Sequence, residues 1–150
     1  MRKVFVMFIW LLSVLSVSAK STPPDSVFHA FIYNEEYQVY MDLDFYNGCV
    51  SVPGQDILGH VSGYFGAVRD SRKWLVTEAR LTGNNKAFIK ITNDYGSEDL
   101  TATLVYNYKD KSYTLRQTGG ARLKIVVNRK WVKIPVELRL FHHERMESRW

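Results

Sequence analysis

Internal disulfide bonds are excluded in this chain, because its 150 residues contain a single cysteine, Cys49. Free cysteine packs as a small hydrophobe, so we expect Cys49 to be a half-buried strand residue. A catalytic thiol would need a histidine and an orienting partner, and no local pattern supplies them. A domain of this length buries roughly two-thirds of its unfolded surface, so an apolar core is enough to hold it together.

Motifs for several kinds of chemistry are also missing. The sequence has no phosphate-binding loop, zinc-ligand spacing or nucleophile elbow. The oxygen-rich segment Asn93–Asp99 lacks calcium-loop spacing and has the residue types of a hairpin turn. Asp42 and Asp44 share one strand face, which we expect to be exposed, while the adjacent His142 and His143 point to opposite strand faces. We therefore expect no catalytic residue, metal, cofactor or nucleic-acid partner, and an enzyme is the less favoured class.

The long apolar run of this sequence lies at its N-terminus. Positive residues 2–3 precede the uncharged run 4–12, and small residues follow before Lys20. This is the layout of a cleaved secretory signal, and the run is shorter than the about 20 residues of a membrane span. We expect removal of residues 1–19 by cleavage after Ala19. The prediction is a secreted or periplasmic protein with no stable membrane anchor.

No apolar pattern at helical period follows the signal, and the chain consists of short strand-like runs separated by turns. After an extended lead over residues 20–26, these runs cover 27–33, 37–45, 49–52 and 64–68, and further strands begin near Trp74, Lys86, Asp99, Ser112, Arg122 and Val136. Regular spacing with turn residues in each gap is typical of antiparallel hairpins. We predict one all-β domain over 27–141, an antiparallel meander of about eight to ten strands. A closed barrel is favoured over a two-sheet sandwich, because sandwiches need longer crossings. Residues 142–150 are expected to form a frayed tail.

Local patterns give three finer predictions. Residues 37–45 alternate, so Tyr37, Val39, Met41, Leu43 and Phe45 should face the core, and Gln38, Tyr40, Asp42 and Asp44 should face water. Asn47-Gly48 is a strong hairpin turn pattern. The segment 55–63 is predicted to be a loop with a short helical turn around residues 56–58, and 69–73 to be a charged turn.

The export signal, the size and the meander over residues 27–141 resemble the secreted lipocalin-like β-barrels of bacteria. Lipocalins open with Gly-x-Trp near the first strand, and this chain has none; Gly63-Tyr64-Phe65 is the nearest match and lies further along. The resemblance is thus one of architecture. It implies a ligand cavity inside the barrel.

Aromatic residues are the first candidate site. Rings with a polar tip suit the mouth of a ligand cavity, although aromatic residues are also normal in strands. The ligand-binding candidates are Tyr64, Trp74, Tyr106, Tyr113, Gln117 and Trp131. Gln117 is included because it shares an otherwise apolar strand face, where it lies either at the strand end in water or in a cavity.

Basic residues are the second candidate site. The net charge is +5, but residues 20–115 carry −3 and residues 116–150 carry +6. Arg129, Lys130 and Lys133 surround Trp131, which indicates either an anion-binding rim or a cation–π contact that needs no ligand.

Two functions follow from these observations. The first is an exported non-enzymatic binding protein that holds a small apolar or amphipathic molecule in a barrel cavity. The alternative is an extracytoplasmic protein–protein interaction or inhibitor module with a filled core and an exposed aromatic or basic patch. The volume inside the barrel separates the two.

Overall fold

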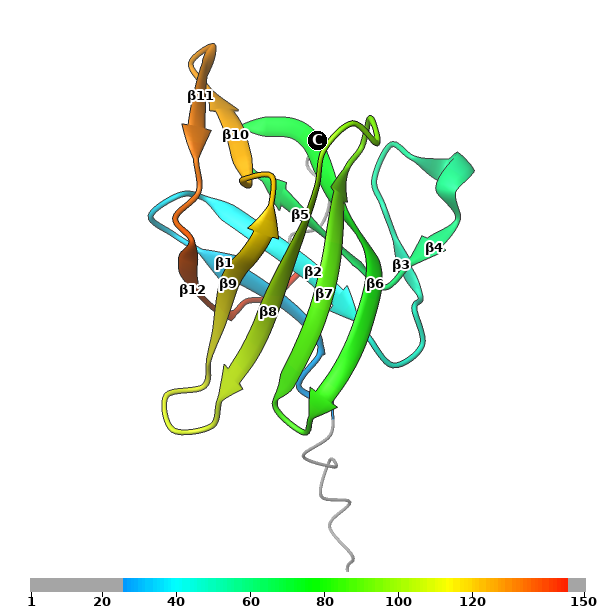
Figure 1. Ribbon diagram of the computed structural model, residues 1–150, viewed down its shortest axis with the longest axis vertical. Coiled ribbons are helices and arrows are strands. Elements are labelled where there is room, and N and C mark those ends of the chain that lie inside the picture. The colour runs from blue at the N-terminus through cyan, green and yellow to red at the C-terminus, as the bar shows by residue number, and fades with distance from the viewer. Residues whose placement is uncertain (1–25, 146–150) are drawn as a thin grey trace, which may run out of the picture.

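The computed structural model describes residues 26–145, which form an eight-stranded antiparallel closed barrel (Figure 1). Its strands are β1 (His29–Asn34), β2 (Val39–Asp44), β5 (Gly63–Ala67), β6 (Asp70–Gly83), β7 (Lys86–Asn93), β8 (Asp99–Asn107), β9 (Ser112–Gly120) and β12 (Glu137–His142). Two hairpins are inserted between barrel strands: β3 (Val50–Ser51) with β4 (His60–Val61), and β10 (Lys124–Val127) with β11 (Lys130–Lys133). The predicted all-β fold is confirmed. The predicted signal, residues 1–19, lies outside the described residues.

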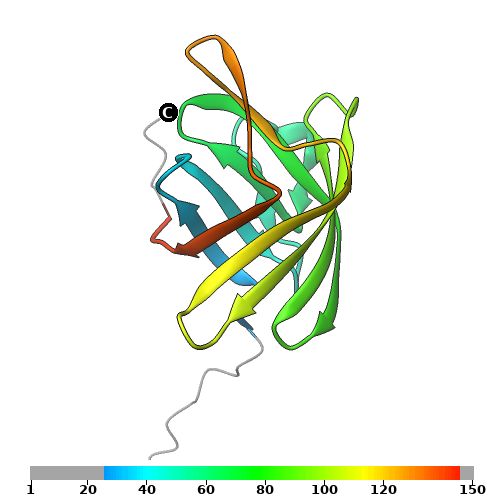
Figure 2. The ribbon, with the colours of Figure 1, turned by 60° about the vertical axis from the view of Figure 1, so that its left-hand side comes forward.

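Each barrel strand pairs with the next barrel strand along the chain, so the barrel is an up-and-down meander. The last strand, β12, lies between β9 and β1 and closes the sheet, as Figure 2 shows. Ile32 is opposite His142 and Tyr33 is opposite Phe141 in this closing pair. Closure leaves the sheet without free edges. The sequential pairing of neighbouring strands agrees with the reason that the barrel was favoured, since a sandwich needs longer crossings.

The interior of the barrel is filled by apolar side chains. Fully buried residues from six different strands meet there: Ile32, Met41, Ile89, Leu104, Leu115 and Leu140. Each of these six residues is at most 1% exposed. Eight strands enclose an interior just wide enough for side chains to fill, and this barrel is of the filled kind.

Buried or partly buried hydrogen bonds link segments at both ends of the barrel. At one end, Gln117 accepts the backbone N–H of Leu123 (2.8 Å) and donates to the carbonyl oxygen of Pro135 (3.0 Å). At the other end, the Tyr113 hydroxyl donates to the carbonyl oxygen of Val27 (2.5 Å). The Gln117 side chain is therefore buried and links two loop segments by hydrogen bonds, and it does not lie in water at the end of its strand.

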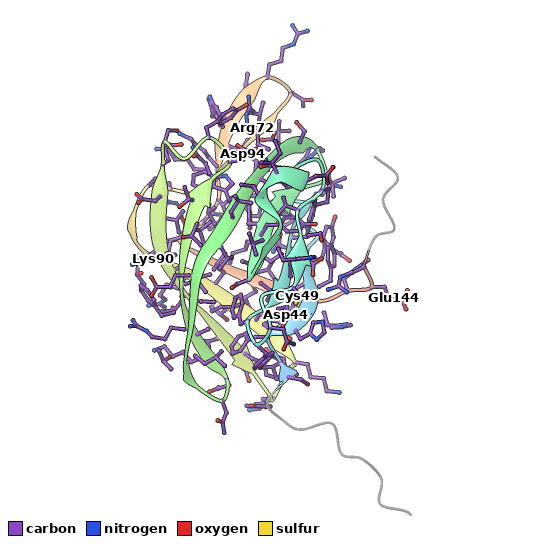
Figure 3. All side chains as sticks on the ribbon, turned by 90° about the vertical axis from the view of Figure 1, so that its right-hand side faces the viewer. Asp44, Cys49, Arg72, Lys90, Asp94 and Glu144 are labelled. Atoms are coloured by element: carbon purple, nitrogen blue, oxygen red, sulfur yellow. The ribbon has the colours of Figure 1, made fainter. Side chains whose placement is uncertain are left out.

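The region after β2 differs from the hairpin predicted at Asn47-Gly48. The chain turns there, and Gly48 has the positive φ (61°) that such a turn requires, but the strand that follows pairs with β4 and not with β2. Both edges of β2 are already taken by β1 and β5. Cys49, predicted to be a half-buried strand residue, is exposed and lies just before β3 (Figure 3).

The face of β2 predicted to be wet is instead largely covered. Asp42 is 8% exposed and Asp44 is 4% exposed. Arg145 pairs with the Asp42 carboxylate at 2.8 Å, and Asp44 accepts the backbone N–H of Asn47 at 3.0 Å. Burial opposes ionisation of Asp44, but backbone N–H donors and the nearby His29 together hold the pKa of this carboxyl below its ordinary value.

Element boundaries differ from the predictions in four places. Strand β4 (His60–Val61) lies inside the predicted loop 55–63. Strand β6 begins at Asp70, inside the predicted charged turn 69–73. Strand β11 lies between the strands predicted to begin near Arg122 and Val136, where the sequence analysis predicted no strand. Residues 142–145, expected to belong to a frayed tail, extend β12 to His142 and place Arg145 on Asp42. The short helical turn is confirmed as a 3-10 turn over Asp56–Leu58. In residues 26–145 no helix has the length and apolar character that crossing a membrane requires.

Candidate functional site

A large pocket lies on the outside of the barrel. It has a volume of about 760 Å³ and is bounded by the outer faces of β1, β2 and β5, by residues 53–55 after β3, and by the turn between β5 and β6. Pockets of roughly 300–1,000 Å³ are the size that small-molecule ligands occupy. We call this feature the outer pocket.

One wall of the outer pocket is a strip of three aromatic rings from neighbouring strands. Phe31 and Tyr40 are stacked with ring centroids 5.2 Å apart, and Tyr40 meets Tyr64 edge to face at 6.0 Å. The three side chains come from β1, β2 and β5 and alternate with the residues that fill the barrel. The aromatic strip therefore presents an apolar surface with two phenol groups to the pocket.

The inserted hairpin is held on the barrel wall by a second, small apolar cluster. Val50 and Val52 from the insert pack with Tyr64 and Leu75, which come from β5 and β6. Gln55 also donates to the Asp94 carboxylate (3.4 Å) in the turn between β7 and β8. Long-range packing of the insert thus creates the opposite side of the pocket.

The phenol groups of the aromatic strip stay protonated at neutral pH. Burial raises the pKa of both Tyr40 and Tyr64, and the negative charge of Asp42 acts in the same direction. Among residues 26–145 neither hydroxyl has a hydrogen-bond partner. Both are therefore available to a ligand in the pocket.

A polar end of the outer pocket lies at the start of β6. Lys73 is 8% exposed, and its ammonium donates to the carbonyl oxygen of Ser71 (3.0 Å). Burial lowers the pKa of Lys73, while the charges of Asp70 and Asp94 oppose that change. Arg69 lies at the same end and is exposed. An apolar wall with cations at one end is an amphipathic site.

The structure does not bring the ligand-binding candidates from the sequence together. Tyr64 belongs to the outer pocket, whereas Trp74 is in the barrel core and donates to the Lys124 carbonyl oxygen at 3.4 Å. Tyr106 and Tyr113 contact each other (4.8 Å between centroids) at the opposite end of the barrel. Gln117 ties the loops described above, and Trp131 is 58% exposed on β11.

The basic candidates Arg129, Lys130 and Lys133 are exposed on the hairpin that projects from one end of the barrel (Figure 1). They are not the cations over Trp131. Arg72 and Lys124 each lie 5.0 Å from the centre of its ring. Side chains alternate along a strand, so Lys130 points away from the face that carries Trp131. A smaller pocket of about 280 Å³ adjoins Trp131 at this end, where Figure 3 shows Arg72 and Asp94.

The pocket residues missed by the sequence reasoning include Phe31, Tyr40, Arg69 and Lys73. Phe31 was placed within an apolar strand, Tyr40 on a wet face, and Lys73 in a charged turn. The sequence contains one indication of this pocket. Tyr40 is an aromatic residue on the strand face that was expected to be in water, where smaller polar groups are usual.

Comparison of the chain with models of protein families, with curated proteins and with solved structures finds no match in any of the three. The class is therefore defined by the fold alone, an eight-stranded antiparallel closed barrel. Within the described part of the chain, no three residues among His, Cys, Asp and Glu are grouped so that they could hold a metal ion.

Proposed function

We propose that this chain is an exported, non-enzymatic binding protein that holds a small amphipathic molecule in the outer pocket. The observation that carries the proposal is the aromatic strip of Phe31, Tyr40 and Tyr64 along a pocket of about 760 Å³. A mostly apolar wall with a few polar groups is what small-molecule sites commonly present. Export after cleavage at Ala19 is part of the proposal, and N-terminal sequencing of the mature protein tests it.

The lipocalin-like resemblance suggests a ligand inside the barrel, and the filled interior argues for a different place. Met41, Ile89 and Leu115 are at most 1% exposed and belong to the core cluster, so an internal ligand would have to displace core side chains. The outer pocket needs no such displacement. We therefore place the ligand on the outer wall of β1, β2 and β5.

A fluorescent probe tests this proposal. N-phenyl-1-naphthylamine is a neutral apolar dye whose emission rises when it leaves water. We expect saturable binding at one site per chain, and we expect Tyr64→Ser to weaken it about tenfold or more, because a buried aromatic contact is lost. Leu81→Ser, at an exposed apolar residue on β6, is the matched control and should leave binding unchanged. Linear, non-saturating emission would contradict the proposal.

A second candidate function is a protein–protein interaction module. The observation that favours it is the β10–β11 hairpin, whose exposed Trp131 is flanked by Arg72 and Lys124. Tryptophan and arginine are enriched at the centres of protein interfaces. If the fluorescent dye does not bind, a specific complex that is lost on Trp131→Ala would support this second function.

A further inference from the structure

The hydrogen-bond donors at the polar end of the outer pocket outnumber their partners. A lysine ammonium has three N–H donors, and Lys73 gives one to the Ser71 carbonyl oxygen. Within residues 26–145 its ammonium makes no other hydrogen bond, and the residue as a whole is 8% exposed. Buried charged groups are normally paired, so this arrangement leaves room for an acceptor from a ligand.

Arg69 adds a second cation without a partner. It lies in the turn between β5 and β6 and lines the same pocket. In the part of the chain that the structure describes, its guanidinium has neither a hydrogen bond nor an ion pair. A guanidinium is suited to oxyanions, because its planar donors match two oxygens at once.

Two carboxylates lie near Lys73 at this end of the pocket, those of Asp94 and Asp70. Oδ2 of Asp94 accepts the backbone N–H of Lys73 (3.2 Å), and its buried Oδ1 has no hydrogen-bond partner among the described residues. Oδ1 of Asp70 accepts the backbone N–H of Arg72 (3.1 Å) and lies 3.5 Å from the Arg72 guanidinium. Its Oδ2 accepts the backbone N–H of Val126 (2.7 Å). Asp70 therefore holds β10 and the start of β6 in place, and it leaves the donors of Lys73 and Arg69 to a ligand.

We propose that the ligand of the outer pocket is an amphipathic anion, with an oxyanion group on Lys73 and Arg69 and an apolar body on the aromatic strip. This inference rests on the proposed function and names the chemical class of its ligand. The oxyanion is a carboxylate, sulfonate or phosphate joined to an apolar body. A free inorganic anion has no body to place against Phe31, Tyr40 and Tyr64 and should bind poorly.

A matched pair of dyes separates this inference from the proposed function. N-phenyl-1-naphthylamine and 8-anilino-1-naphthalenesulfonate share their rings and differ by one sulfonate. We expect both dyes to bind at one site. The affinity for 8-anilino-1-naphthalenesulfonate should be about tenfold higher, because its sulfonate adds one charge-assisted hydrogen bond. Sodium sulfate at a concentration similar to that of the dye should displace neither dye. If the two dyes bind equally, this inference is overturned and the proposed function stands; if neither binds, the proposed function fails.

Variants of Lys73 and Arg69 test whether these two residues cause the preference for the sulfonate dye over the neutral dye. Lys73→Met and Arg69→Gln should each reduce severalfold the ratio of the affinity for the sulfonate dye to the affinity for the neutral dye. Lys130→Met on the exposed β11 strand is the control and should keep the full preference. Arg69 is exposed, so its variant tests the inference even if Lys73→Met does not fold. A sulfonate preference that persists in every folded variant of Lys73 and Arg69 would overturn the assignment.

Discussion

A Cβ atom at Gly66 would lie 2.7 Å from Cζ of Tyr40 and 2.8 Å from its hydroxyl oxygen. The two residues are direct cross-strand partners on β5 and β2. Glycine at this position therefore lets the Tyr40 ring cover the backbone of β5, a contact in which an aromatic ring packs over a strand glycine. The shape of the outer pocket depends on this contact, because Tyr40 forms the middle of the aromatic strip.

Gly66→Ala should displace the Tyr40 ring and weaken binding of the neutral dye about tenfold. Overpacking of a filled site costs about 1–3 kcal/mol, so we also expect that loss in the free energy of unfolding. Dye titration and urea unfolding measure the two effects. Gly83→Ala is the matched control, since nothing lies within 4 Å of its added Cβ. Unchanged binding in Gly66→Ala would show that the Tyr40 ring does not shape the site.

Gln117→Leu tests whether the loops at one end of the barrel are held by one side chain. The change removes the acceptor of the Leu123 N–H and the donor to the Pro135 carbonyl oxygen. A buried polar group left without a partner costs about 1–3 kcal/mol, and we expect a loss of about 2–4 kcal/mol in the free energy of unfolding.

Dye binding should be unaffected in Gln117→Leu, because Gln117 is not part of the outer pocket. Arg116→Gln, which removes an exposed ion pair with Glu137, should cost less than about 1 kcal/mol. A Gln117→Leu protein as stable as the wild type would contradict the role given to this residue.

The barrel could be predicted from the sequence because its determinants are local. Alternation in residues 37–45 and turn residues at regular intervals specify strands and hairpins, and closure of their edges follows from general physics. Asn47-Gly48 shows the limit of local patterns. The turn forms as predicted, but the two edges of β2 pair with β1 and β5, so the strand that follows the turn does not pair with β2.

The outer pocket could not be predicted, because it forms by contacts between distant segments. Tyr40 was correctly placed on the face opposite the core, yet nothing in its own strand shows that residues 50–55 fold over that face. Lys73 lies in a stretch whose charges are typical of a solvated turn, and only the start of β6 at Asp70 places it in the wall. Tyr64 was expected in a barrel cavity and lies outside the barrel.

Tyr113 should make stability depend on pH in the alkaline range. Burial raises the pKa of Tyr113 above its ordinary value near 10, with the nearby Tyr106 and Tyr46 acting in the same direction. A group whose folded pKa is raised stabilises the fold fully below its unfolded pKa and less as pH rises above it. The difference in unfolding free energy between the wild type and Tyr113→Phe isolates this contribution.

We expect that difference to be about 1–2 kcal/mol near pH 7, from the lost hydrogen bond to Val27, and to shrink above pH 10. Urea unfolding of both proteins between pH 7 and 11 provides the measurement. Tyr108→Phe, at a half-exposed tyrosine, is the control. A difference that is constant over this range would mean that Tyr113 ionises as readily in the folded protein as in the unfolded chain.

The location of the ligand is tested most directly by a two-dimensional NMR titration of the labelled protein with 8-anilino-1-naphthalenesulfonate. Binding in the outer pocket should shift the backbone amides of Gly54, Gln55 and Val68, which line it, and leave those of Ile89, Leu104 and Leu115 unchanged. Saturable shifts confined to the first group are the predicted result. Shifts centred on Ile89, Leu104 and Leu115 would place the ligand inside the barrel and contradict the account.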